Sequence, residues 1–114
     1  MVTWERVVEL ARELPEVEEG LSWRRPALKV RGKTFAGLST RHEGAMWARC
    51  DRDERPLLVA SKPDVYRLTP HYERSPAYLL VWLEHADEED VRERLIDAWL
   101  LQAPKRLAAQ VSFD

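Results

Sequence analysis

The sequence predicts an α+β domain in which helices pack against a largely antiparallel sheet. The chain has 114 residues, 45% of them hydrophobic, which suffices for one core and one domain. Apolar residues recur at helical spacing near both ends, and short β-forming runs separated by turn residues fill the middle. The predicted element order is α-β(3)-α-β(2)-α, in a single domain of residues 1–114 whose core spans about residues 3–107.

The two outer helices have start and stop signals. Thr3 can cap a helix whose apolar positions recur from Trp4 to Leu14, and Pro15 follows its end. Asp87 can cap a last helix, which ends before Pro104. Helices with one apolar stripe each are expected to cover a face of the sheet.

Three short strands are predicted in the first half of the chain. They cover residues 27–30, 34–39 and 45–50 and form a meander. Gly32 can adopt the positive φ of a tight hairpin turn between the first two. Residues 15–20 precede the meander and are interpreted as an acidic connector.

The second half is predicted to hold a helix and two strands. The helix begins after the acids of residues 51–54 and ends near Pro63. A fourth strand covers residues 65–68, and a loop bracketed by prolines covers residues 69–76. The most apolar run, residues 77–83, is predicted as a central strand.

Composition favours a cytoplasmic protein without membrane contact. The only cysteine, Cys50, cannot form an internal disulfide and suits a reducing compartment, where we expect a buried thiol. Glu5 and Glu9 argue against a secretory signal peptide. No apolar run reaches the roughly 18 residues of a membrane span. A monomer or weak dimer is expected.

The charge is segregated along the chain, although its net value is only −2. Acidic residues dominate residues 1–20 and 84–97, whereas residues 21–42 contain bases and no acid. Because side chains alternate along a strand, Lys29 and Arg31 share one face, as do Trp47 and Arg49. Such a face could contact phosphates and stack a base, or it could be an ordinary charged solvent face.

The candidate site residues follow from this pattern. The candidate nucleic-acid-binding residues are Arg24, Arg25, Lys29, Arg31, Lys33, Arg41, Arg49 and Arg67. The candidate stacking or ligand-binding residues are Trp23, Trp47, His71 and Tyr72. Trp23 and Trp47 are the tryptophans expected to be exposed. The pair of residues 71–72 equally fits a structural role, with hydrogen bonds inside the loop and packing at the sheet edge.

Motifs for catalysis and cofactor binding are not found in the sequence. It has no glycine-rich phosphate-binding motif and no H-E-x-x-H, and its three histidines are isolated. A single cysteine cannot build a zinc site. The acids at residues 51–54 and 88–90 are explained as helix N-terminal residues. We therefore expect no enzyme activity, no metal and no cofactor.

Four segments together resemble the MmcQ/YjbR-like family, over about residues 3–107. They are LPEVEEG (14–20), PALKVRGKTFA (26–36), PDVYRLTPHY (63–72), and AW with APKRL (98–99 and 103–107). The resemblance implies an α-β(3)-α-β(2)-α fold, similar to that of type III secretion chaperones. It also implies DNA binding through a double-wing arrangement, and it brings no catalytic residues.

Two functional hypotheses of different classes result. The first is a small non-enzymatic protein that binds DNA through a basic hairpin and strand surface. The alternative is a small-molecule-binding or sequestering protein, with a cleft of aromatic residues and an arginine beside His71 and Tyr72. A protein-interaction module on the same fold is the third option.

Overall fold

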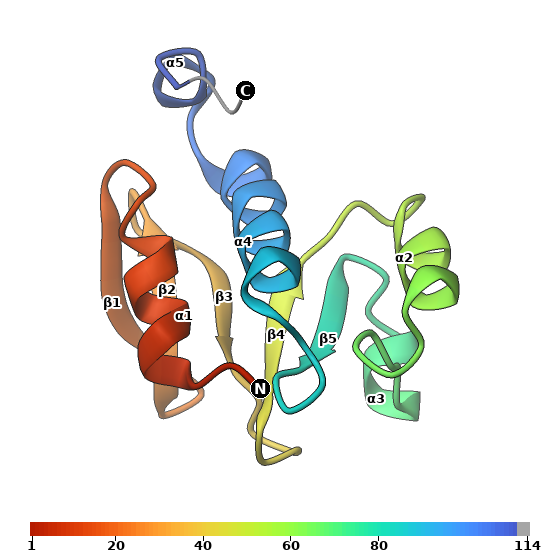
Figure 1. Cartoon of the computed structure of the whole chain (residues 1–114). Helices are drawn as coiled ribbons and strands as arrows, with labels where there is room; N and C mark the ends of the chain where they lie inside the picture. The colour runs from red at the N-terminus through yellow and green to blue at the C-terminus, as the bar shows by residue number, and fades with distance from the viewer. Residues whose placement is uncertain (112–114) are drawn as a thin grey trace.

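A five-stranded antiparallel sheet, in the order β1-β2-β3-β4-β5, forms the centre of the computed structural model (Figure 1). The strands are β1 (Val17–Ser22), β2 (Arg25–Val30), β3 (Lys33–Leu38), β4 (Ala45–Arg49) and β5 (Tyr78–Trp82). The helices are α1 (Trp4–Ala11), α2 (Arg55–Ser61), α3 (Pro70–Glu73), α4 (Glu88–Gln102) and α5 (Lys105–Ala108). The structure describes residues 1–111, so the predicted domain's last three residues lie outside it. The predicted α+β class is confirmed.

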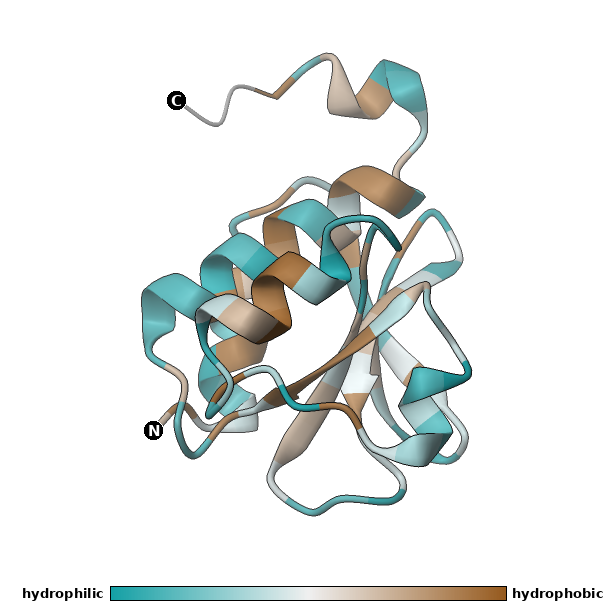
Figure 2. Ribbon diagram, turned by 90° about the vertical axis from the view of Figure 1, so that its right-hand side faces the viewer, coloured by the Kyte–Doolittle hydropathy of each residue, from teal (hydrophilic) through white to brown (hydrophobic). Residues whose placement is uncertain are grey.

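The helices α1 and α4 cover one face of the sheet. Leu95 and Trp99 of α4 pack with Leu28, Met46 and other buried residues of the strands in one apolar core. Figure 2 shows brown, apolar segments in both the helical layer and the sheet that it covers. Full burial of one such side chain stabilises the fold by about 1.5–3 kcal/mol. None of the helices in residues 1–111 has the length and hydropathy needed to cross a membrane.

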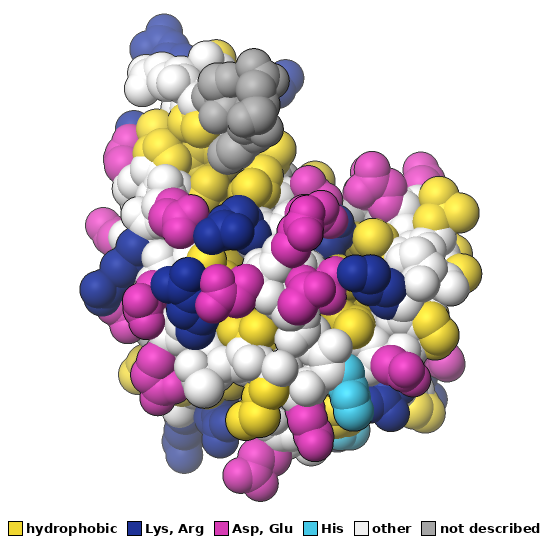
Figure 3. Space-filling view, in the orientation of Figure 1, with side chains coloured by type: hydrophobic (Ala, Val, Ile, Leu, Met, Phe, Trp, Pro, Cys, Tyr) yellow, Lys and Arg dark blue, Asp and Glu magenta, His cyan; other side chains and the backbone are white. Residues whose placement is uncertain are grey.

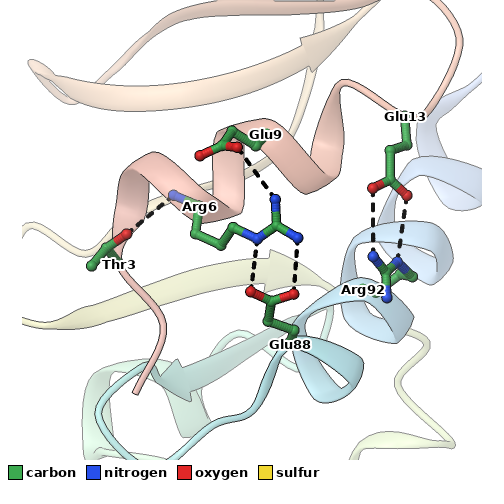
Figure 4. Close-up of polar contacts among 6 residues, drawn as sticks. All are labelled: Thr3, Arg6, Glu9, Glu13, Glu88 and Arg92. Atoms are coloured by element: carbon green, nitrogen blue, oxygen red, sulfur yellow. Dashed lines mark hydrogen bonds and ion pairs between the residues drawn. The ribbon is translucent and has the colours of Figure 1, made fainter.

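Two ion pairs on the outside hold α1 against α4 (Figure 4). Arg6 Nε lies 2.7 Å from Glu88 Oε2, and Arg6 Nη2 lies 2.9 Å from Glu88 Oε1. This hydrogen-bonded pair raises the pKa of Arg6 and lowers that of Glu88. Arg92 Nε lies 3.4 Å from Glu13 Oε1 near the other end of α1. Both ion pairs are exposed to solvent. Each therefore adds little to the free energy of folding and mainly sets how α1 lies against α4.

The prediction of an acidic connector at residues 15–20 is wrong. Residues 17–22 form β1, whose backbone pairs with β2 from Val17 opposite Val30 to Ser22 opposite Arg25. β1 is an edge strand, and Glu18 and Glu19 are exposed. An edge strand is stabilised by backbone hydrogen bonds to one neighbouring strand and needs little apolar burial. Because residues 17–22 include acidic residues, they lack the apolar pattern from which strands are predicted.

The predicted strand at residues 65–68 is also wrong. Only a single bridge forms there, between Tyr66 and Val81. The pairing stops because the chain turns into α3, which begins at Pro70 inside the segment predicted as a loop. The apolar run predicted as a central strand is β5, the last strand of the sheet. Its middle residues are buried because helices pack on both of its faces.

Candidate functional site

The sheet face opposite α1 and α4, called here the open face, carries the short helix α3. Tyr72 of α3 packs on Trp47 and Leu80 in a second, smaller apolar cluster. Strand alternation places Trp47 on this face, opposite the core residues Met46 and Ala48, as the sequence predicted. The sequence could not show that α3 would lie over it.

A cavity of about 480 Å³ lies on the open face. Its lining residues come from β1, β3, β4, β5, α3 and the adjoining turns: Ser22, Trp23, Thr34, Thr40, Arg41, Trp47, His71, Tyr72, Ser75 and Tyr78. The volume falls in the range of roughly 300–1,000 Å³ that is usual for ligand sites. The cavity brings together all four predicted stacking residues and one predicted phosphate-binding residue, Arg41.

Aromatic rings form much of the cavity surface. Trp47 and Tyr78 meet edge to face, with ring centroids 5.6 Å apart, and His71 contacts Tyr72 in the same way at 5.1 Å. Trp47 was expected to be exposed, and this is wrong, since only 9% of its surface is accessible. The ring is covered because Tyr72 packs on it and because it lies against Gly37 on the other side.

A hydroxyl pair on the cavity wall leaves one proton without an acceptor. Ser39 Oγ accepts hydrogen bonds from the backbone N–H groups of Arg41 (3.2 Å) and His42 (3.1 Å). A hydroxyl oxygen has two lone pairs, so the Ser39 proton is donated to Tyr72 Oη at 3.4 Å. The phenolic proton of Tyr72 is then available to an acceptor in the cavity.

Arg55 at the start of α2 holds α3 in place, a role that no pattern in the sequence indicated. Its Nη1 donates to the carbonyl oxygens of Tyr72 (2.9 Å), Ser75 (2.9 Å) and Tyr78 (3.1 Å). These carbonyls belong to α3, to the turn after it and to β5. One guanidinium thus fixes the cavity wall to the edge of the sheet.

Trp23 and Arg24 form the two-residue turn between β1 and β2. Their φ angles are +52° and +64°, a conformation that only Gly and a few other residues adopt easily. Both φ values are positive, as a type I′ hairpin turn requires. Trp23 is 84% exposed and borders the cavity.

The β2–β3 turn has the same positive-φ geometry, but it lies at the other end of β2. Gly32 there has a φ of +81°, which confirms the sequence prediction. Arg31 pairs with Glu16, Nε to Oε1 at 2.6 Å, and this bond raises the pKa of Arg31 and lowers that of Glu16. Arg24 and Arg25 are therefore separated from Arg31 and Lys33 by the roughly 20 Å length of a six-residue strand.

The bases on the open face and its adjoining turns differ from those on α1 and α4. Arg6, Arg92 and Arg94 each pair with a carboxylate, and Figure 3 shows acids and bases intermingled over α1 and α4. Within residues 1–111, seven predicted bases form no ion pair: Arg24, Arg25, Lys29, Lys33, Arg41, Arg49 and Arg67. Two of these contact aromatic rings, Arg49 over Tyr78 at 5.1 Å and Arg67 over Trp82 at 4.8 Å. Lys33 is exposed at the β2–β3 turn.

Cys50, considered for other chemistry, does not line the cavity. Cys50 is buried, as predicted, and burial raises the pKa of its thiol, which disfavours the reactive thiolate. The described residues contain no group of three or more His, Cys, Asp and Glu side chains that could hold a metal. The cavity instead offers rings, hydroxyls, one histidine and one arginine, which are groups that bind a ligand.

Several lining residues were not predicted, although strand alternation could have suggested one of them. Tyr78 pairs with Arg49 and so shares the face of Trp47. Thr34 pairs with Lys29 beyond the register shift between Leu28 and Lys29, so alternation along β3 alone could not place it. The other hydroxyls, on Ser22, Thr40 and Ser75, come from strand ends and turns. Their positions depend on how α3 and the β1–β2 turn fold over the sheet.

The comparisons with known proteins agree with the fold. The family model YjbR matches residues 12–101. Uncharacterised proteins of Mycobacterium tuberculosis and Mycobacterium bovis are 33% identical over 121 residues, covering 94% of this chain and 93% of theirs. A Deinococcus radiodurans crystal structure with a DUF419 domain superposes with a TM-score of 0.70 at 18% identity, covering 89% of this chain and 78% of that one.

Proposed function

Because the chain belongs to the YjbR family, we propose that it is a non-enzymatic DNA-binding protein that holds DNA against the open face of its sheet. One observation carries the proposal. The predicted bases that form no ion pair within residues 1–111 lie on and around the open face, next to the aromatic cavity. A partner for this surface must carry negative charge and offer planar rings, and DNA has both.

The distribution of charge also favours approach of the DNA to the open face and not to the helical face. The helical face carries an excess of acids on α1 and at the start of α4, which repels a polyanion. The exposed side chains of Arg24, Arg25 and Arg41 are free to contact phosphates. Lys33 stands at the opposite end of the sheet and can reach a phosphate about six nucleotides away, at roughly 3.4 Å per step.

The test compares two double charge reversals that change the net charge equally. Arg24→Glu with Arg25→Glu alters the β1–β2 turn, and Lys105→Glu with Arg106→Glu alters the exposed α5. DNA affinity is measured by fluorescence anisotropy over a range of salt concentrations. We expect the turn variant to lose at least tenfold in DNA affinity. The slope of log K against log salt concentration should become shallower by about 2, because two phosphate contacts are lost.

The α5 variant is expected to bind nearly as the wild type does. Equal losses in both variants would mean that binding follows net charge alone and would contradict the open-face site. The absence of DNA binding by the wild type at low salt would overturn the proposed function.

A second candidate, the binding of a small aromatic anion, is favoured by one observation. The cavity has the volume of a small-ligand site, and the hydroxyl-bearing side chain of Tyr72 lines it. Binding of this kind would show little dependence on salt. Titration of tryptophan fluorescence with aromatic carboxylates and nucleoside monophosphates would detect it, because Trp23 and Trp47 line the cavity.

A further inference from the structure

We infer that the cavity on the open face receives an unpaired nucleobase stacked on Trp23, so that the DNA bound by this protein is single-stranded. The inference rests on the proposed function and specifies the form of its partner. It depends on the shape of the cavity, on the conformation of the Trp23 turn, and on the polar groups of the lining.

The shape of the cavity favours an unstacked base over the stacked bases of an intact duplex. Its lining residues come from the sheet, from α3 and from the β1–β2 turn, so the binding surface is hollow. In a duplex the base faces are stacked and only base edges are accessible in the grooves. A protein reads those edges with an element that projects into a groove, whereas a hollow accepts a base that has left the stack.

The conformation of Trp23 is the second observation. Asn-Gly or Asp-Gly suits a two-residue turn with two positive φ angles, yet this turn contains Trp23 and Arg24 at +52° and +64°. The indole ring is also 84% exposed, which is unfavourable for so large an apolar side chain. Folding therefore gives no reason for a tryptophan at this position. An exposed indole followed directly by Arg24 and Arg25 is a suitable surface for a base whose adjoining phosphates contact the two arginines.

The polar lining matches the edges of a base. Tyr72 offers a donor, since Ser39 already donates to its oxygen. Thr40 and Ser75 carry hydroxyls, which both donate and accept. Because any base presents donors or acceptors, this lining accepts bases without strong sequence preference, as in other proteins that bind single strands by stacking.

The experiment uses the full chain and three fluorescein-labelled probes. These are a 12-nucleotide dT strand, the same strand paired with dA, and a 12-nucleotide abasic strand that keeps only sugars and phosphates. The wild type is expected to bind the dT strand at least tenfold more tightly than either of the other probes. Equal or tighter binding of the duplex would overturn the inference and leave the proposed function standing. Failure to bind any probe at low salt would overturn both.

Trp23→Asn removes the ring and places a residue that suits a positive φ, so the turn is kept. We expect this variant to melt no lower than the wild type and to bind the dT strand about tenfold more weakly. Its affinity for the duplex and abasic probes should not change. Leu21→Asn is the control, because Leu21 is 65% exposed on β1, which leads into the Trp23 turn, but does not line the cavity. Wild-type affinity of Trp23→Asn for the dT strand would overturn the role of Trp23 and hence the inference.

Discussion

The indole ring of Trp47 lies against the backbone of Gly37 on the neighbouring strand. A Cβ atom at Gly37 would come within 2.9 Å of both Cζ2 and Nε1 of that ring. The two residues are paired across β3 and β4, so their side chains would share the open face. The missing side chain at Gly37 therefore sets the position of Trp47, and with it the shape of the cavity.

Gly37→Ala should destabilise the fold and weaken ligand binding. The new methyl group has no room beside the indole ring, so Trp47 must shift towards Tyr78 and the cavity. Overpacking of this kind costs about 1–3 kcal/mol, which urea unfolding would measure. Gly20→Ala is the matched control, because its Cβ would meet only the flexible end of Lys29, with Cε at 2.9 Å. A loss in Gly20→Ala as large as in Gly37→Ala would contradict this explanation.

Arg55→Met should loosen α3 and reduce DNA affinity without touching the DNA site itself. The substitution leaves the carbonyl oxygens of Tyr72, Ser75 and Tyr78 without their guanidinium donor. We expect a loss of about 2 kcal/mol in the free energy of unfolding, together with faster hydrogen exchange in α3 and β5. Arg52→Met, an exposed position three residues earlier, removes the same charge and should change neither quantity. Unchanged exchange in Arg55→Met would show that α3 is held by Tyr72 packing alone.

The sequence predicted the fold class and most of the elements because their signals are local. Helix caps at Thr3 and Asp87, the glycine turn at Gly32 and strand alternation around Trp47 depend on neighbouring residues only. β1 was missed because an acidic edge strand is stabilised by its partner strand and not by its own apolar pattern.

The cavity could be predicted only in part, because it forms from segments that are distant in the chain. The alternation pattern placed Trp47 and Arg49 on one face correctly. It could not show that α3 would bury Trp47, or that Arg55 would reach three carbonyls 17 to 23 residues away. Nor could it show that Trp23 would take a positive φ, because a bulky residue such as tryptophan rarely adopts that conformation.

Asp90→Asn should lower the free energy of unfolding at neutral pH. It should also remove part of the decrease in that free energy at acidic pH. Burial opposes the charge of Asp90, but hydrogen bonds from the Lys62 ammonium and the Asp87 backbone outweigh it and lower the pKa of this carboxyl. A lowered pKa in the folded state means that the ionised carboxylate stabilises the protein above its ordinary pKa of 3.8. This contribution is lost as the pH falls through the lowered value.

We therefore expect Asp90→Asn to cost about 1–2 kcal/mol at pH 7 and progressively less in strong acid. Urea unfolding at pH 7 and at pH 2 would measure both. Asp64→Asn, at an exposed carboxylate, is the control and should be neutral at both values. A cost for Asp90→Asn that stays constant down to pH 2 would show that the amide disturbs the α4 capping box and not the charge.

Ser39→Ala and Tyr72→Phe should separate stability from binding at the same hydroxyl pair. Ser39 is buried, and its oxygen satisfies the backbone N–H groups of Arg41 and His42, so Ser39→Ala leaves both without an acceptor. This should cost about 1–3 kcal/mol in unfolding free energy and disturb the turn that carries Arg41.

Tyr72→Phe keeps those two bonds and removes only the phenolic proton, so its stability should fall by less than about 1 kcal/mol. Its affinity for the dT strand should nevertheless drop severalfold, because the donor that faces the cavity is gone. Wild-type affinity in Tyr72→Phe would mean that the bound group places no acceptor at this wall, and the polar contacts would then have to come from Thr40 and Ser75.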